Sequence, residues 1–248
     1  MGDCLPKNGS RHDMGGQVVA FFDYSRLPIL FALRYTFNMA EIGVLGGTFD
    51  PPHEGHLTLA RAARQQWGLE RVLWVLTPAP PHKRGQRLTP LEHRLAMVQL
   101  ALQGEPAFEL SRVDIDRPPP HYAVDTLRLL ARQYPAAGLI YLMGADSLRD
   151  LPLWHRAAEF VASCAGVAVL PRPGVDLDLN VLEQRLPGLR AKVRWLEAPP
   201  MAVSSSEIRR RLAQGQTVEG LLPPAIAAYI VQHGLYRSDG QRLAPTNR

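Results

Sequence analysis

Two histidines lie three residues apart at the end of a glycine-rich stretch, a spacing that suits a phosphate site. The stretch is Gly46-Gly47-Thr48-Phe49-Asp50-Pro51-Pro52, and His53-Glu54-Gly55-His56 follows it. Adjacent glycines let the backbone approach a bulky ligand, and the two prolines stiffen the turn. A helix beginning at Gly55 would point its free amides and positive dipole end into the same space. Both imidazoles would then face one ligand and donate to phosphate oxygens that gain charge during a transfer reaction.

The strands and helices that must position these histidines can be predicted from the sequence pattern. Short β-rich runs alternate with longer helical patterns. The expected strands are Ile42–Leu45, Val72–Leu76, Phe108–Leu110, Leu139–Met143, Val167–Leu170 and Val193–Leu196. The expected helices are Gly55–Trp67, Pro90–Leu102, Ala123–Tyr134, Ser147–Ala162 with a break at Pro152, Leu179–Leu186, Ser205–Ala213 and Pro224–Gln232. This pattern predicts an α/β fold, a Rossmann-like doubly wound parallel sheet with flanking helices. Such a sheet binds its ligands at the carboxyl ends of the strands.

One helix start and two proline-rich loops carry chemistry of their own. Thr89 is expected to cap the helix that begins at Pro90, because proline suits the first helical position and Glu92 lies three residues after the cap. Pro78–Pro81 and Pro118–Pro120 are too short to link domains. We expect them to shape rigid loops over the site.

Composition favours a soluble cytoplasmic protein with an anionic ligand. The 248 residues carry 28 basic and 23 acidic side chains, and 46% hydrophobic content is enough for one α/β core. The basic residues are scattered, which disfavours nucleic-acid binding. No early apolar stretch is long and clean enough to span a membrane or serve as a signal peptide. Cys4 and Cys164 form no disulfide or metal motif, as in a reducing compartment.

The domain organisation is expected to be simple. Residues 1–38 show no sustained period and are predicted to be a poorly ordered N-terminal extension. A single domain is predicted over 39–237, followed by a flexible tail over 238–248. The oligomeric state, including a homo-oligomer, is left open.

The glycine-rich stretch resembles the nucleotidylyltransferase superfamily, whose mark is a His-x-Gly-His loop after the first strand. The stretch has neither the Walker A pattern nor the dinucleotide-binding glycine pattern. Val203-Ser204-Ser205-Ser206-Glu207-Ile208-Arg209 is similar to the superfamily's Ile-Ser-Ser-Thr-x-x-Arg element, with Ser206 in the usual place of threonine. The resemblance implies that hydroxyls and amides at this helix start meet the ATP phosphates and that Arg209 clamps their charge. The implied ATP ligands in the two motifs are Gly46, Gly47, Thr48, Phe49, His53, His56, Ser205, Ser206 and Arg209.

Further segments narrow the resemblance to the nicotinate mononucleotide adenylyltransferases, over roughly Ile42 to Tyr236. The matching segments are Pro80-Pro81-His82-Lys83, Met143-Gly144-Ala145-Asp146-Ser147-Leu148, Leu151-Pro152-Leu153-Trp154, Leu170-Pro171-Arg172-Pro173-Gly174 and Gly234-Leu235-Tyr236. By that likeness Gly144 and Asp146 would hold the adenosine, and Trp154 would stack on the pyridine ring. His82 and Lys83 would serve phosphates. Arg172 fits a plain loop charge equally well, so it is left out of the expected site.

One segment departs from the family pattern. Pro119-Pro120-His121-Tyr122-Ala123 matches the family's Ser/Thr-Tyr-Thr segment only in Tyr122. In the family this segment helps to recognise the nicotinate carboxylate, largely through backbone amides. Tyr122 is retained as a substrate-binding residue, and selectivity for the acid over the amide stays open.

The resemblance implies a step of NAD biosynthesis in which a phosphate oxygen of nicotinate mononucleotide attacks the α-phosphorus of ATP. The products are nicotinate adenine dinucleotide, or deamido-NAD, and pyrophosphate. His53, His56, Lys83 and Arg209 would be the catalytic residues, with Mg²⁺ bound mainly by ATP oxygens and no dedicated protein metal site.

Alternatives from other classes remain. A transferase specific for phosphopantetheine or CTP would share the His-x-Gly-His loop, but we would not expect it to carry both the Trp154 region and the Gly-x-Asp-Ser segment. A nucleotide-sensing or nucleic-acid-binding module on the same fold would explain the sequence pI near 9.5 without catalysis.

Overall fold

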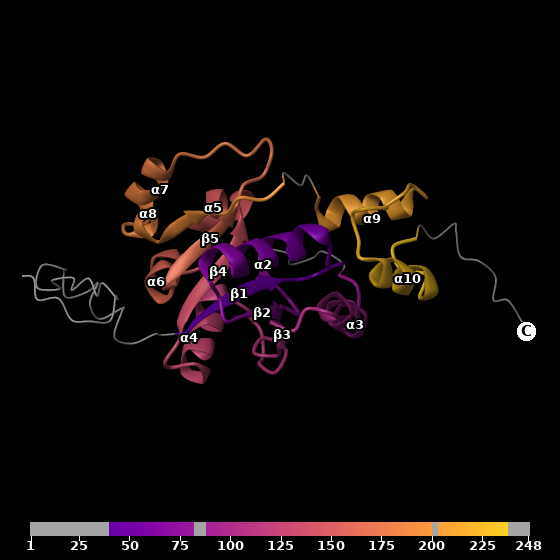
Figure 1. Ribbon diagram of the computed structural model, residues 1–248, viewed down its shortest axis with the longest axis horizontal. Helices are drawn as coiled ribbons and strands as arrows, with labels where there is room; N and C mark the ends of the chain where they lie inside the picture. Colours follow the sequence, from indigo (N-terminus) through magenta and orange to yellow (C-terminus); the bar gives the residue numbers. More distant parts are fainter. Residues whose placement is uncertain (1–39, 82–87, 200–202, 238–248) are drawn as a thin grey trace, which may run out of the picture. The chain divides into compact units, whose positions relative to one another are not determined.

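A six-stranded parallel sheet forms the centre of the structure, in the order β3-β2-β1-β4-β5-β6 (Figure 1). The computed structural model describes residues 40–81, 88–199 and 203–237. The strands are β1 (Glu41–Gly47), β2 (Arg71–Leu76), β3 (Phe108–Ser111), β4 (Gly138–Gly144), β5 (Gly166–Leu170) and β6 (Val193–Trp195). All six expected strands are confirmed, and their ends differ from the expected ones by at most two residues.

The strand order reverses between β1 and β4. From β1 the chain moves outward to β2 and β3, and it then returns to form β4 on the other side of β1. The helices after these two central strands, α2 (Glu54–Trp67) and α5 (Ala145–Asp150), therefore pack on opposite faces of the sheet, and in such folds this reversal point at the carboxyl edge is where ligands bind. The predicted Rossmann-like doubly wound fold is confirmed.

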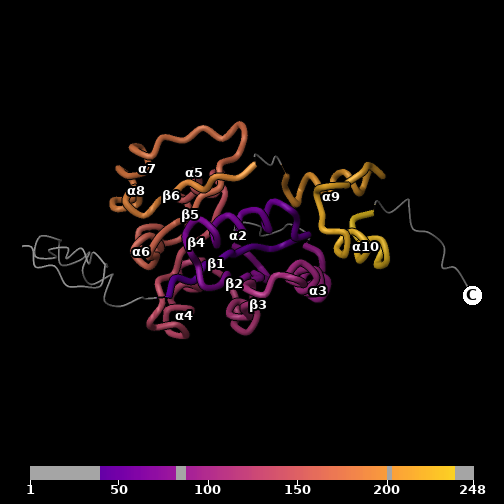
Figure 2. The backbone as a smooth tube through the Cα atoms, in the orientation of Figure 1, coloured from indigo at the N-terminus to yellow at the C-terminus, as the bar shows by residue number. Residues whose placement is uncertain are grey.

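Helices cover both faces of the sheet because the strand side chains alternate between two buried clusters. One cluster joins Trp74 and Leu142 to α2 (Glu54–Trp67), α3 (Leu91–Leu102), α9 (Ser205–Ala213) and α10 (Pro224–Gln232). The other joins Val75 and Tyr141 to α4 (Ala123–Gln133), α5 (Ala145–Asp150), α6 (Ala157–Ser163), α7 (Leu179–Arg185) and α8 (Leu189–Lys192). On the first face α10 packs against α3 (Figure 2).

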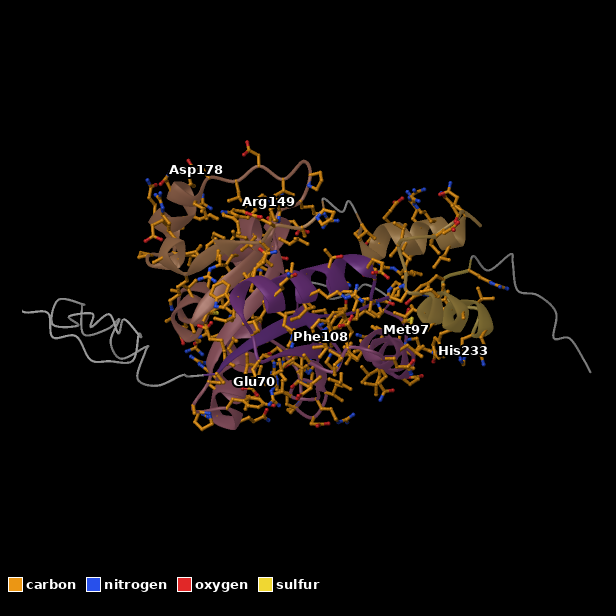
Figure 3. The ribbon with its side chains drawn as sticks, in the orientation of Figure 1. Glu70, Met97, Phe108, Arg149, Asp178 and His233 are labelled. Carbon is orange, nitrogen blue, oxygen red and sulfur yellow. The ribbon has the colours of Figure 1, made fainter. Side chains whose placement is uncertain are left out.

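The labelled side chains of Figure 3 illustrate this division. Met97 on α3 and Phe108 on β3 are buried, whereas Glu70, Arg149 and Asp178 are exposed on connections and helix ends. The interior is thus apolar, and most charges lie outside it. The few buried polar groups are informative for that reason, since each needs a partner.

Three local expectations need correction. Thr89 does not cap α3: Pro90 takes the N-cap position with φ −46° and ψ 145°, and the helix begins at Leu91. Thr89 instead donates its backbone N–H to Asp50 and accepts from Arg94 through its carbonyl. The helix predicted over Ser147–Ala162 is broken at Pro152 as expected, but the break is wider. It comprises the 3₁₀ turn η3 (Leu151–Leu153) and the residues up to Arg156. The four-residue α8 was missed because one turn has no measurable period.

The predicted extension over 1–38 and tail over 238–248 lie outside the described residues, so both stay predictions. The described ranges all belong to one unit of the chain, Met39–Arg248. No helix within those ranges is long and apolar enough to cross a membrane.

Candidate active site

The glycine-rich stretch lies at the carboxyl end of β1, beside the point where the strand order reverses. β1 ends at Gly47, and α2 begins at Glu54 with His53 as its N-cap. A Cβ atom on Gly46 would lie 2.7 Å from the hydroxyl oxygen of Tyr141 on β4. A side chain at position 46 would therefore have to displace the buried Tyr141 hydroxyl, so packing against the neighbouring strand favours glycine here in addition to any ligand. The stretch therefore begins where β1 ends, next to β4.

The two predicted catalytic histidines stack on each other. Their ring centroids are 3.7 Å apart with 28° between the planes, and Nδ1 of His56 accepts the backbone N–H of His53 at 3.2 Å. The edge of His56 meets Phe49, whose ring stacks on buried Trp74, both with centroids 5.0 Å apart. His56 is thus fixed from two sides, by a neighbouring ring and by the helix start.

His53 is neutral over the physiological pH range. It is 7% exposed, and burial lowers its pKa to about 3, with the charge of Arg172 acting in the same direction. Its Nδ1 is buried and has no hydrogen-bond partner among the residues that the structure describes. A neutral imidazole keeps one N–H donor and one lone pair, so His53 can donate to an anionic ligand without carrying charge.

Asp50, within the glycine-rich stretch, forms hydrogen bonds to three other segments of the chain. It is 1% exposed, and its Oδ1 accepts the hydroxyl of Tyr236 at 2.7 Å while its Oδ2 accepts the Thr89 N–H at 3.2 Å. Its carbonyl oxygen accepts from Nη1 of Arg209 at 2.7 Å. Asp50 therefore links the glycine-rich stretch to α9, to the start of α3 and to the residues after α10.

Arg94 holds the neighbouring loops through their backbones. Its buried guanidinium donates to the carbonyls of Thr48, Thr77, Pro78 and Thr89, at 2.8 to 3.0 Å. Burial lowers the pKa of Arg94, and the nearby Asp50 carboxylate opposes that shift. Because one rigid fork satisfies four carbonyls, the loops after β1 and β2 keep a fixed spacing.

The serine-rich motif docks directly onto the glycine-rich stretch. Ser204 caps α9 by accepting the Glu207 N–H at 3.2 Å, and the Ser205 hydroxyl donates to the carbonyl of Pro51 at 2.9 Å. Nη2 of Arg209 donates to the Ser206 hydroxyl at 3.3 Å. The glycine-rich stretch and the serine-rich motif, the two predicted halves of the phosphate site, are therefore in contact. The Ser205 hydroxyl donates its hydrogen bond within the protein.

Arg172 connects the predicted adenosine residues to this motif. Its Nη1 pairs with Oδ2 of Asp146 at 2.7 Å, and its Nη2 donates to the Val203 carbonyl at 3.1 Å. A Cβ atom on Gly144 would lie 2.5 Å from Oδ1 of Asp146, so the glycine lets the carboxylate fold back over the end of β4. Arg172 was not among the residues predicted for the site. Its position just after buried strand β5, at the carboxyl edge, was the available signal.

Tyr122 and the loop that carries Trp154 and His155 come together near Tyr141. Trp154 is half-buried, and its ring meets Tyr141 and Phe160 edge-on with centroids 6.0 and 5.2 Å away. Tyr122 stacks on His155 with centroids 3.9 Å apart. The predicted pyridine-binding residues are therefore neighbours through His155, and Tyr141 lies against both Trp154 and Gly46.

A buried carboxylate fixes the segment that departs from the family pattern. Asp114 accepts from the hydroxyls of Thr77 and Thr126 and from Arg117, and Arg117 in turn donates to the Tyr122 carbonyl. This network ties the loop after β2 to the first turn of α4. The position of Tyr122 thus depends on contacts that its own motif does not contain.

Comparison with known proteins gives the family. Residues 44–211 match the cytidylyltransferase-like family model. A relative from Thermomicrobium roseum named "Probable nicotinate-nucleotide adenylyltransferase" is 46% identical over 200 residues, which are 81% of this chain and 93% of the relative. A relative of the same name from Roseiflexus sp. is 43% identical and covers 81% of this chain and 100% of the relative. The chain belongs to the nicotinate-nucleotide adenylyltransferase family.

A solved structure shares the fold of this family member. Plasmodium falciparum nicotinic acid mononucleotide adenylyltransferase complexed with NaAD superposes with a TM-score of 0.67 at 20% identity, covering 79% of this chain and 97% of that one. At this identity the likeness shows the fold. The family predicted from the motifs is confirmed, and with it the assignment to the nucleotidyltransferases.

Two predicted residues fall in a gap between the described ranges. His82 and Lys83 lie outside the described residues, so their phosphate-binding role stays a prediction. Within the described ranges no group of three or more histidine, cysteine, aspartate or glutamate side chains is arranged to hold a metal ion. The carboxylates of Asp50 and Asp146 are engaged by Tyr236 and Arg172 respectively.

Proposed function

We propose that this nucleotidyltransferase transfers the adenylyl group of ATP to nicotinate mononucleotide in NAD biosynthesis. A phosphate oxygen of the mononucleotide attacks the α-phosphorus of ATP, a new P–O–P bond forms, and the bond to pyrophosphate breaks. The products are nicotinate adenine dinucleotide and pyrophosphate. The names of the relatives support this reaction, as do structures of the Plasmodium falciparum enzyme complexed with NaAD and with APC. We also propose that the reaction takes place in the cytoplasm.

The observation that carries the proposal is the pair of stacked histidines beside Arg209 at the carboxyl edge of β1. His53 is buried and neutral, so it can donate one N–H to a phosphate oxygen without carrying charge. His56 and His53 would donate to the phosphate oxygens as negative charge develops, and Arg209 would supply fixed positive charge. Preorganised donors of this kind lower the barrier without a covalent intermediate.

The two nucleotides would occupy opposite sides of Tyr141. Gly144 and Asp146 would receive the adenosine, where Arg172 already orients the carboxylate. Trp154 and Tyr122 would receive the pyridine nucleotide, with the half-buried tryptophan stacking on the ring. This arrangement would place the mononucleotide phosphate and the ATP α-phosphate at the end of β1.

Magnesium would enter as part of the substrate. Mg²⁺ prefers oxygen ligands and keeps several waters, and ATP supplies phosphate oxygens for it. When bound, it would offset the charge on the leaving pyrophosphate. Removal of Mg²⁺ with a chelator should abolish turnover and leave the melting temperature of the substrate-free protein unchanged.

The test is pyrophosphate release by the full chain with ATP and nicotinate mononucleotide, with the dinucleotide identified by mass spectrometry. Parallel reactions replace the mononucleotide with nicotinamide mononucleotide or phosphopantetheine, or ATP with CTP. His56→Ala should abolish most of the product, whereas His233→Ala, which removes an exposed histidine after α10, should leave turnover unchanged. Absence of dinucleotide with the wild-type chain would overturn the proposal, and preferential use of CTP or phosphopantetheine would reassign the substrate.

A further inference from the structure

Tyr236 is distant in sequence from the glycine-rich stretch, yet its hydroxyl hydrogen-bonds to a residue of that stretch. The O–H donates to Oδ1 of Asp50 at 2.7 Å across 186 residues. Asp50 is 1% exposed, so its carboxylate has almost no contact with water. A buried carboxylate that loses a donor must move or be destabilised in place, because solvent cannot replace the lost hydrogen bond. The position of Asp50 therefore depends on Tyr236.

Backbone strain occurs at both ends of this contact. Phe49, next to Asp50, has φ 47°, and Tyr236 has φ 63°. Residues with a Cβ atom seldom adopt this left-handed region, and they remain there only where surrounding contacts hold them. The hydrogen bond between Asp50 and Tyr236 is one such contact, because it joins the two strained segments directly.

A shift of Asp50 would displace the groups that are proposed to act on the phosphates. Its carbonyl holds Nη1 of Arg209 at 2.7 Å, and the ring of the preceding Phe49 contacts His56. A shift of this one residue would therefore misalign both the positive charge and one of the phosphate donors. Small displacements of preorganised groups reduce turnover more than they reduce ground-state binding.

We propose that Tyr236 is a positioning residue for adenylyl transfer, whose hydroxyl holds the glycine-rich stretch through Asp50. Burial and the nearby Asp50 carboxylate raise the pKa of Tyr236, so the hydroxyl keeps its proton and remains a donor. The kinetic part of this inference rests on the proposed function. Tyr236 itself touches neither substrate and acts by holding Asp50.

The kinetic test is Tyr236→Phe, which removes the donor and keeps the ring. We expect kcat to fall about tenfold, the loss of one hydrogen bond to a charged group, while KM for the mononucleotide changes less than about twofold. The matched control is Tyr229→Phe on α10, whose hydroxyl contacts Nδ1 of His93 at 2.9 Å, away from the site. The control should have wild-type kcat and KM.

A second measurement does not depend on catalysis. Amide hydrogen exchange of the segment Phe49–His53, without substrates, should be faster in Tyr236→Phe and unchanged in Tyr229→Phe. If the wild-type chain made no dinucleotide, the proposed function would fail, but this measurement would still decide the role of Tyr236. Wild-type kcat and wild-type exchange in Tyr236→Phe would overturn the inference.

A double-mutant cycle tests whether Tyr236 acts through Asp50. In the Asp50→Asn background, Tyr236→Phe should cost clearly less than tenfold, because the hydrogen bond to a neutral amide is about half as strong. An undiminished loss would show that Tyr236 acts by another route. Should Tyr236→Phe fail to fold, Asp50→Asn alone carries the test: we expect reduced kcat with faster exchange at Phe49–His53, and wild-type values of both would refute the proposal.

Discussion

Acidification should destabilise the folded chain through His53. The folded state keeps this imidazole neutral, with its pKa lowered from 6.5 to about 3 by burial first and by Arg172 second. In the unfolded chain the His53 imidazole has its ordinary pKa of about 6.5. As the pH falls, the unfolded chain therefore binds a proton on His53 that the folded chain does not bind. This contribution to stability is complete above the unfolded pKa and is lost as the pH falls from about 6.5 towards 3.

The magnitude follows from the two pKa values. At about pH 5, roughly thirty unfolded chains carry the proton on this histidine for each one that does not, while the folded form is almost entirely neutral. The free energy of unfolding therefore falls by about 2 kcal/mol between about pH 7.5 and pH 5 on account of His53 alone. His53 is 7% exposed, so solvent screening does not reduce this figure much.

The assay is urea unfolding of the wild-type chain and of His53→Asn at the two pH values. Other titrating groups contribute equally to both proteins, so the difference between the two pH dependences isolates His53. We expect the variant to lose about 2 kcal/mol less stability than wild type on acidification. His233→Asn, an exposed histidine, is the control and should behave like wild type. Equal pH dependence in wild type and His53→Asn would refute the account of a buried neutral imidazole.

Three further outcomes follow from the site. His56→Ala should lower kcat on the order of a hundredfold with the fold intact by circular dichroism, because one preorganised donor is lost; an unchanged kcat would remove His56 from the catalytic residues. Trp154→Ala should weaken binding of nicotinate and nicotinamide mononucleotide alike by about 1 kcal/mol, through lost stacking, and a titration calorimetry series in which only one of them weakens would contradict this. Arg172→Met should raise KM for ATP about tenfold, since Asp146 loses its charged partner, and Arg149→Met, which removes an exposed partner of Asp150, is the control that should not.

Much of the fold could be predicted because its signals are local. Runs such as Val72–Leu76 are apolar on both faces, as a central parallel strand requires. The glycine pair and the two histidines occupy one continuous stretch, so their type and spacing indicate a phosphate site before any tertiary contact is known. The position of Arg209 in the first turns of a helix was also predictable, because its motif is complete within a single helix start.

The remaining site residues depend on contacts between distant segments. Tyr236 and Asp50 are 186 residues apart, and neither has a neighbour in sequence that indicates the other. Arg94 lies on an ordinary helical pattern, where an arginine normally faces water, yet it is buried and binds four carbonyls. Thr89 was misassigned for a similar reason, since its local sequence favours a cap while its backbone is held by Asp50 and Arg94.

The most direct test of adenylyl transfer follows oxygen atoms through the reaction. Nicotinate mononucleotide labelled with ¹⁸O in its phosphate is turned over with unlabelled ATP, and both products are analysed by mass spectrometry. Attack by the mononucleotide phosphate on the α-phosphorus of ATP predicts that all the label stays in the dinucleotide and that pyrophosphate carries none. Label in the pyrophosphate, or ATP cleavage without a labelled dinucleotide, would contradict the account.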